Sequence, residues 1–125
     1  MPHERQNYGR FGENLAAGHL AEMGYRIIET NYRNAFGEID IIAMEGGAIV
    51  FVEVKSRRSN RFGSARGSVS KAKQRKISMV ALGYLKSSGK ANQKARFDVV
   101  AIHSGTGDSE KRIEVIKNAF NLAYG

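Results

Sequence analysis

Apolar residues recur at two different periods along this chain, and these periods predict helices and strands. In residues 9–25 and 71–89 they recur every three or four positions, as they do on one face of an α-helix. Gly24 fits the end of the first helix, and Ser70 fits the N-cap of the second. The apolar stripe of the second helix consists of Ile77, Val80, Ala81, Tyr84 and Leu85.

Apolar runs of strand length fill most of the remaining chain. They lie at residues 25–33, in the two arms of a hairpin within 37–55, and at 95–103 and 111–116. Residues 117–125 carry only a weak pattern and are expected to form a terminal tail. The predicted order is helix, three strands, helix, two strands, which is an α/β arrangement.

The segment 56–70 lacks apolar periodicity and is rich in Ser, Gly and Arg. This composition predicts an exposed, mobile and basic loop. The chain has 125 residues, no internal repeat and no linker. We therefore expect residues 1–125 to form a single domain.

The composition excludes several kinds of site. The chain has no cysteine, so it has neither disulfides nor thiolate metal sites, and its three histidines are too scattered to indicate zinc. The N-terminus lacks an apolar leader, and the apolar run AIVFV is far too short to span a membrane. We expect a cytoplasmic protein with no membrane partner.

Positive charge is concentrated in one part of the chain. The segment from Lys55 to Arg96 contains thirteen of the twenty Lys and Arg residues and no Asp or Glu. Such a one-signed surface typically binds a polyanion such as nucleic acid, although it can also serve only to keep a protein soluble. Neither predicted helix has the Lys-rich polar face and bulky apolar face of a membrane-surface anchor.

The hairpin within 37–55 carries acidic residues that a buried hairpin does not need. If Gly46 and Gly47 form a two-residue turn, the numbers of cross-strand partners sum to 93. Asp40 then lies opposite Glu53, and Glu38 lies opposite Lys55. Alternation places these four side chains on one face of the sheet. The other face then carries Ile39, Ile41, Val52 and Val54.

Two opposed carboxylates repel each other unless something offsets their charge. A raised carboxyl pKa or Lys55 could do so, but a hard divalent cation such as Mg²⁺ is the best partner, because it binds one or two carboxylates and keeps positions for water and phosphate. Such a metal would activate water toward phosphorus, and Lys55 could orient that water or stabilise the transition state. An inert cluster of ion pairs is the alternative, and a three-residue turn would separate the two acids.

Glu13 is a third acidic candidate. It shares a helical stripe with Ala16, Leu20 and Met23, so it could approach the sheet and bind a second metal or a water at the metal. Alternatively, Glu13 lies in the first turn of the helix and only complements the helix dipole.

These residues resemble a known motif. Asp40 followed by Glu53-Val54-Lys55 is similar to the signature of the PD-(D/E)xK nuclease superfamily, with Ile39 where the superfamily name has Pro. The segments RFGENLAAGHL, NYR, GEIDIIA, FVEVKSR and RFDVVAI resemble the YraN-like family, an uncharacterised bacterial group similar to Holliday-junction resolvases. The resemblance covers nearly the whole chain.

The resemblance implies a restriction-endonuclease-like core, in which helices flank a central mixed β-sheet. It also implies a magnesium- or manganese-dependent endonuclease. By position, Asp40 and Glu53 would be metal ligands together with the main-chain carbonyl of Val54. Lys55 would be the catalytic lysine, and Glu13 would be the glutamate of the first helix.

Basic and polar side chains next to this motif are candidates for binding the phosphate backbone. They are Arg57, Arg58, Arg61, Arg66, Lys71, Lys73 and Gln74.

Two functions remain open from the sequence. The first is a metal-dependent nuclease that cuts structured or branched DNA, which would have to be a homodimer to cut both strands of a junction. The second is a non-catalytic module that binds DNA or RNA and retains the nuclease fold.

Overall fold

The computed structural model describes residues 2–57, 69–104 and 111–121, together with their side chains except those of residues 2–11, 57, 104 and 111. The elements are α1 (Pro2–Glu22), β1 (Arg26–Asn34), β2 (Gly37–Glu45), β3 (Ala48–Arg57), α2 (Lys71–Ser87), β4 (Ala95–Ser104) and β5 (Lys111–Phe120). The predicted order of helices and strands is confirmed. Neither helix in these ranges has the length and apolarity that a membrane crossing requires.

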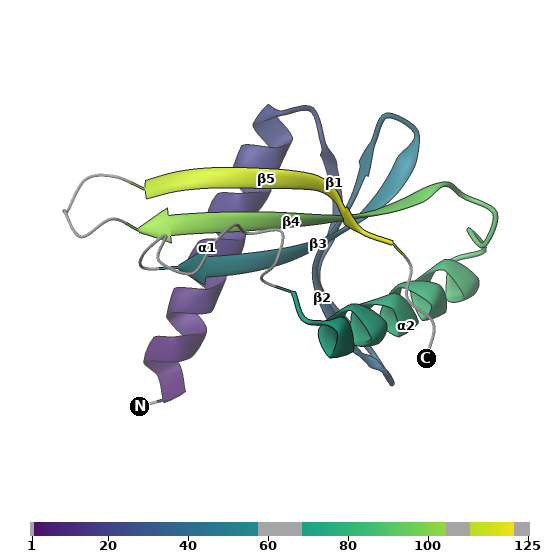
Figure 1. Cartoon of the computed structure of the whole chain (residues 1–125), viewed down its shortest axis with the longest axis horizontal. Helices are drawn as coiled ribbons and strands as arrows, with labels where there is room; N and C mark the ends of the chain where they lie inside the picture. The colour runs from purple at the N-terminus through teal and green to yellow at the C-terminus, as the bar shows by residue number, and fades with distance from the viewer. Residues whose placement is uncertain (1, 58–68, 105–110, 122–125) are drawn as a thin grey trace.

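All five strands form one mixed sheet in the order β1-β2-β3-β4-β5. Neighbouring strands are antiparallel except β3 and β4, which are parallel and connected through α2. Parallel neighbours need a crossover connection, and the chain uses α2 for it. Figure 1 shows α1 and α2 on opposite faces of the sheet, so the restriction-endonuclease-like α/β core expected from the resemblance is confirmed.

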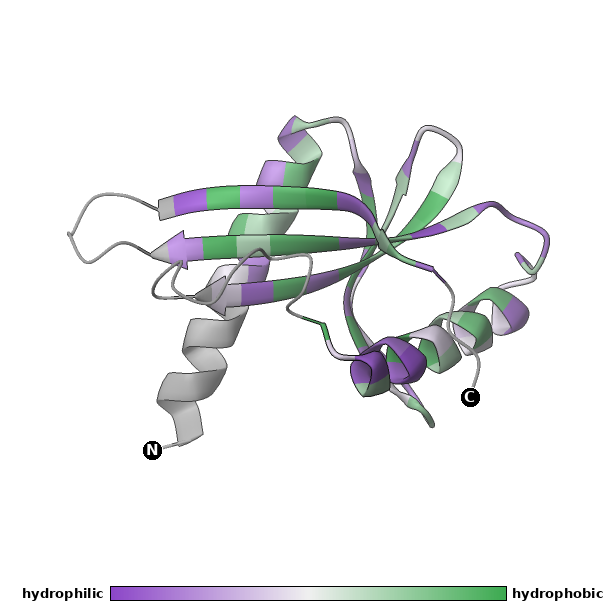
Figure 2. Cartoon of the chain, viewed as in Figure 1, coloured by the Kyte–Doolittle hydropathy of each residue, from purple (hydrophilic) through white to green (hydrophobic). Residues whose placement is uncertain are grey.

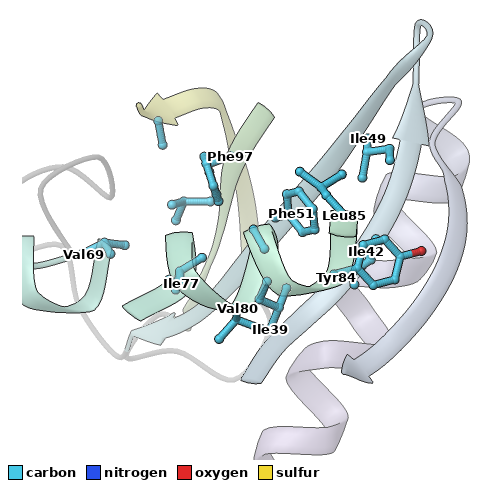
Figure 3. Packing of buried hydrophobic residues seen from close by; sticks show 13 residues of the cluster. Ile39, Ile42, Ile49, Phe51, Val69, Ile77, Val80, Tyr84, Leu85 and Phe97 are labelled. Carbon is cyan, nitrogen blue, oxygen red and sulfur yellow. The ribbon is translucent and has the colours of Figure 1, made fainter. Parts of the chain in front are cut away.

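Two apolar clusters hold the layers together, and hydrophobic residues accordingly concentrate on the central strands (Figure 2). On the α2 face, Val80, Tyr84 and Leu85 pack against Phe51 and Phe97 (Figure 3). The cluster on the α1 face consists mainly of Ala16, Leu20, Tyr25, Ile41, Val50, Val52, Val100 and Ile102. Burial of these side chains is the main force that fixes both helices on the sheet.

The structure moves several predicted boundaries. Helix α1 begins at Pro2 instead of residue 9, and β5 continues to Phe120 through the first part of the expected tail. The loop expected at 56–70 is shorter at both ends. Its first two residues belong to β3, which ends at Arg57, and Val69 is buried in the α2 cluster. Of the residues added at these boundaries, Val69 and Ala119 are buried apolar side chains, so burial accounts for part of the change.

The predicted helix ends are largely confirmed. The Ser70 hydroxyl caps α2 by accepting a hydrogen bond from the Lys73 main-chain N–H at 3.1 Å. Gly24 follows the last turn of α1 with a φ of 99°, a conformation that suits glycine. Met23 was expected in the buried stripe, but it lies beyond the end of α1 and is exposed.

A second acidic site, separate from the hairpin, lies in the interior of the protein. There a buried carboxylate on β4 joins residues from three parts of the chain. Asp98 on β4 is fully buried, and it accepts two hydrogen bonds from the Arg96 guanidinium, at 2.9 and 3.0 Å. The Tyr25 hydroxyl donates to it at 2.8 Å and the Asn118 main-chain N–H donates at 2.9 Å. Because the charge is paired and its oxygens are satisfied, the burial of Asp98 is tolerated.

This network generates a stability prediction. Asp98→Ala would leave Arg96 without its buried partner, and we expect a loss of about 3–5 kcal/mol in the free energy of unfolding. Urea denaturation followed by circular dichroism measures it. The control is Lys117→Ala, which removes a half-exposed ion pair to Glu45 and should cost less than about 1 kcal/mol. Equal losses in the two variants would contradict a structural role for Asp98.

Candidate active site

The glycine turn sets the register of the hairpin as predicted. Gly46 and Gly47 have φ angles of 58° and 82°, which two-residue hairpin turns require and which glycine adopts without strain. Pairs from Glu45–Ala48 to Ile41–Val52 follow one register, in which partner numbers sum to 93. The next positions in this register are Asp40 on β2 and Glu53 on β3.

The recorded pairing of β2 with β3 ends at Ile41–Val52, while β2 stays paired with β1 down to Gly37. The Asp40 side chain lies in the gap that opens, where its Oδ2 accepts a hydrogen bond from the Val54 main-chain N–H at 2.8 Å. We call this gap, between Asp40 on β2 and Val54 on β3, the strand fork. A side chain bound to main chain has little freedom, so Asp40 is fixed there.

Glu53 is held close to Asp40 in a nearly dry position. Its side chain is 10% exposed, and Lys73 of α2 approaches its Oε2 with Nζ at 3.7 Å. Burial raises the pKa of Glu53 to about 8, and hydrogen bonding with Asp40 and the negative charge of Asp40 act in the same direction. The charges of Lys73 and Lys55 lower this pKa, but burial and Asp40 prevail.

Glu13 reaches the same place from α1. Burial raises its pKa, as do the charge and hydrogen bonding of Asp40, while a hydrogen bond from Asn31 lowers it. Because α1 begins at Pro2, Glu13 lies well inside the helix, and the alternative that it sits in the first turn is wrong. We refer to Glu13, Asp40 and Glu53 as the carboxylate cluster.

Two of the geometric expectations for the hairpin are wrong. Glu38 is not opposite Lys55, because beyond the fork it faces β1 and forms an ion pair with Arg33 at 2.8 Å. Ile39 packs in the α2 cluster, whereas Ile41 packs in the α1 cluster, so strict alternation fails at Asp40. The divergence of β2 from β3 therefore changes which face each side chain reaches.

Lys55 lies two residues beyond Glu53 and is partly buried, beside Ala101 in the parallel pairing of β3 with β4. Its positive charge acts on Glu53, so it belongs to the surroundings of the carboxylate cluster. The structure thus brings together four predicted site residues: Glu13, Asp40, Glu53 and Lys55.

The predicted phosphate-binding residues have different placements. Lys71 and Lys73 are exposed on the first turn of α2, and the Gln74 side chain is used locally, where it donates to the Val69 carbonyl at 3.0 Å. Arg57 ends β3 opposite His103. Arg58, Arg61 and Arg66 lie outside the described residues.

Two contacts in the site have no strong sequence signal. Lys73 was predicted to bind phosphate, but it also contacts Glu53, a contact set by how α2 packs on the sheet. Asn31 hydrogen-bonds Glu13 from β1 with a φ of 54°, a left-handed conformation that Asn tolerates better than most residues. In the sequence, the one signal at this position is an Asn inside a predicted strand, because Asn adopts the left-handed conformation more readily than most residues.

Within the carboxylate cluster, Asp40 and Glu53 are the pair whose chemistry would fit a hard cation that binds few protein ligands. Within the ranges that the structure describes, no group of three or more Asp, Glu, His or Cys side chains is arranged to hold a metal. Asp40 and Glu53 provide a pair of hydrogen-bonded carboxyls, and burial together with Asp40 raises the pKa of Glu53. A pair fits Mg²⁺ or Mn²⁺, since Mg²⁺ usually takes one or two carboxylates and retains water.

Comparison with known proteins finds a family model and several relatives that carry the same family description. A family model described as "Uncharacterised protein family UPF0102" matches residues 12–102, which include the whole carboxylate cluster. A UPF0102 protein of Syntrophus aciditrophicus is 53% identical over 117 residues, covering 94% of this chain and 91% of the relative. A UPF0102 protein of Desulfosudis oleivorans is 49% identical over 125 residues, covering 98% of each. One of Moorella thermoacetica is 45% identical over 120 residues, covering 96% of this chain and all of the relative.

The raised pKa of Glu53 predicts how stability depends on pH without divalent cations. The folded protein keeps the Glu53 proton up to about pH 8, whereas the unfolded chain loses it near the ordinary pKa of 4.5. Between these values the folded state binds more protons, so stability falls as pH rises. Glu53→Gln should remove most of this fall and be the more stable protein at pH 8–9, by an amount on the order of a few kcal/mol.

Urea denaturation in EDTA at several pH values between 5 and 9 measures this effect. Glu45→Gln is the control, because the Arg96 hydrogen bond lowers the Glu45 pKa and its contribution is lost only at acid pH. An identical pH slope for wild type and Glu53→Gln would show that Glu53 is not strained by burial beside Asp40.

Proposed function

This chain belongs to the uncharacterised protein family UPF0102, and we propose that it is a metal-dependent nuclease that hydrolyses phosphodiester bonds in structured or branched DNA. The observation that carries the proposal is the pair of carboxyls at the strand fork. A protein gains no stability by burying Glu53 against Asp40, so the arrangement favours a function that uses both.

Asp40 and Glu53 are the proposed ligands of Mg²⁺ or Mn²⁺, with the Val54 carbonyl as a further ligand. When bound, such a metal would stabilise negative charge on a phosphate and make water a better nucleophile. Asp40 is suited to this role because the Val54 N–H fixes its orientation before any ligand arrives. Glu13 would then accept hydrogen bonds from water near the pair, or bind a second metal.

Lys55 is the proposed catalytic lysine. Its ammonium group lies near Glu53 on the strand that leads out of the site, so it can orient water or neutralise charge that develops on the phosphate. Lys73 already contacts Glu53, and in the proposed complex it would turn to a phosphate oxygen.

The charge distribution supports a polyanionic substrate. The acid-free segment from Lys55 to Arg96 includes the end of β3 and the whole of α2, both of which border the strand fork. Contacts from Lys and Arg to phosphates position a nucleic acid without reading its sequence. A homodimer would allow both strands of a junction to be cut.

The second candidate function is a non-catalytic nucleic-acid-binding module. The raised pKa of Glu53 favours it in one respect, because a protonated Glu53 lets the cluster persist near neutral pH without a metal. Binding that is unaffected by divalent cations, and unchanged by substitution of the acidic residues, would support this function.

Cleavage of a panel of labelled substrates tests the nuclease. With Mg²⁺ or Mn²⁺, we expect the wild type to cut branched, flapped or single-stranded DNA, while Asp40→Asn and Lys55→Ala lose at least about a hundredfold in rate because the water and the phosphate lose their partners. DNA affinity, measured by fluorescence anisotropy, should change little in Asp40→Asn. The control is Lys117→Ala, which lies away from the fork and should cleave normally. A wild type that cuts no substrate with either cation would contradict the proposal.

A further inference from the structure

A groove of about 500 Å³ lies beside the strand fork, between the turn that joins β1 to β2 and the first half of α2. Its lining includes Arg33, Phe36, Glu38, Lys73, Lys76 and Val80. We call it the Phe36 groove. The lining combines apolar side chains, among them Phe36, Ile77 and Val80, with three cations, and this combination suits a nucleotide.

The Phe36 ring is presented to solvent by a rigid support. Asn34 accepts a hydrogen bond from the Phe36 main-chain N–H at 2.9 Å, and its amide donates to the Val80 carbonyl of α2 at 3.1 Å. Gly83 permits this close approach, since a Cβ there would lie 2.8 Å from the Asn34 Nδ2. The turn is thus fastened to α2, while Phe36 remains 49% exposed.

A single exposed apolar side chain is ordinary on a protein surface. Phe36 differs because it is an aromatic ring placed among cations. Among the described residues, the large apolar side chains that are exposed are Met23, Ile28, Phe36 and Met79, and Phe36 is the aromatic one. It is also the one that lines the groove with Arg33, Lys73 and Lys76. A ring next to cations offers a base a stacking partner and its flanking phosphates a counter-charge.

The charges of the groove favour an anionic ligand. Lys73 and Lys76 are one helical turn apart on α2 and both are exposed. Arg33 is also highly exposed, and it holds Glu38 in an ion pair that reduces the negative charge of the lining. The groove therefore carries a net positive charge.

Lys73 connects the groove to the candidate active site. It lines the groove, and its Nζ lies 3.7 Å from Glu53 Oε2. A strand with one phosphodiester at the carboxylate cluster would therefore have an adjacent nucleotide near the groove. Bases within a duplex are paired and stacked, so only an unpaired base can enter a side groove of this kind.

We propose that the Phe36 groove binds an unpaired base of the substrate strand, with Phe36 stacking on the base and Lys73, Lys76 and Arg33 holding the adjacent phosphates. The inference rests on the proposed function for its choice of nucleic acid as ligand. With this groove, the protein would prefer nucleic acids that contain single-stranded segments, such as flaps, gaps or the open centre of a junction.

Binding experiments in the Asp40→Asn background test the groove without cleavage. The probes are a short single-stranded oligonucleotide and a blunt duplex of equal length, and fluorescence anisotropy gives their dissociation constants. We expect tighter binding of the single strand, and Phe36→Ala should weaken it about tenfold or more while changing duplex binding less than about twofold. Fluorescence of 2-aminopurine in the single strand should be quenched on binding, and Phe36→Ala should abolish the quenching.

Three further variants control for surface and folding effects. Met79→Ala removes an exposed apolar side chain from α2 outside the groove and should bind like the parent protein. Phe36→Trp should retain the single-strand preference, because indole also stacks. Phe36→Leu keeps the apolar bulk without the ring, and it replaces the alanine variant if that protein melts at a lower temperature. Equal effects of Phe36→Ala and Phe36→Leu on single strand and duplex, or no effect of either variant, would overturn the proposal.

The outcomes separate this inference from the nuclease proposal. If Phe36→Ala and Phe36→Leu lose the single-strand preference although the wild type cleaves nothing, the groove assignment stands and the nuclease assignment fails. If the wild type cleaves with Mg²⁺, and Phe36→Ala binds and cleaves every substrate as the wild type does, the groove assignment fails and the nuclease assignment stands.

Discussion

Burial of the Glu53 carboxyl against Asp40 is the constraint that sets the strand fork apart from the rest of the sheet. Three independent parts of the fold hold the two carboxyls together: the glycine turn, the Val54 N–H that binds Asp40, and the helices that cover both faces of the sheet. The cost appears as the raised pKa of Glu53. A cost imposed by so much surrounding structure is typical of functional sites, where stability is given up for chemistry.

The opposite treatment of another acidic residue supports this interpretation. Asp98 is more deeply buried than Glu53, yet a bidentate Arg96, the Tyr25 hydroxyl and a main-chain N–H satisfy its oxygens. The same chain can therefore neutralise a buried carboxylate when only structure is required. At the strand fork, by contrast, Glu53 is buried against a second acidic residue, Asp40, and Lys73 approaches it only to 3.7 Å.

The sequence predicts local features of this protein well because turns, periods and caps are local. The Gly46-Gly47 turn determined the register as far as Ile41–Val52, and Ser70 marked the start of α2. The sequence does not predict contacts that arise where β2 separates from β3, beyond Ile41–Val52. Strict alternation placed Glu38 with Lys55, but the pairing to β1 draws it to Arg33 instead. The groove at Phe36 was also not predicted, because Asn34, Val80 and Gly83 meet only when α2 packs on the sheet.

The distribution of charge can be understood from the same geometry. The acid-free segment begins at Lys55, at the mouth of the strand fork, and continues through α2, whose first turns border both the fork and the Phe36 groove. The charges of Lys73 and Lys55 lower the pKa of Glu53, but burial and Asp40 keep it near 8. The lysines therefore do not offset the effect of burying Glu53 beside Asp40. An ion-pair cluster that served only stability would be balanced within the protein. The nuclease proposal gives this arrangement a use, because a divalent cation between the two carboxyls and a phosphate against the basic surface would balance both sets of charges.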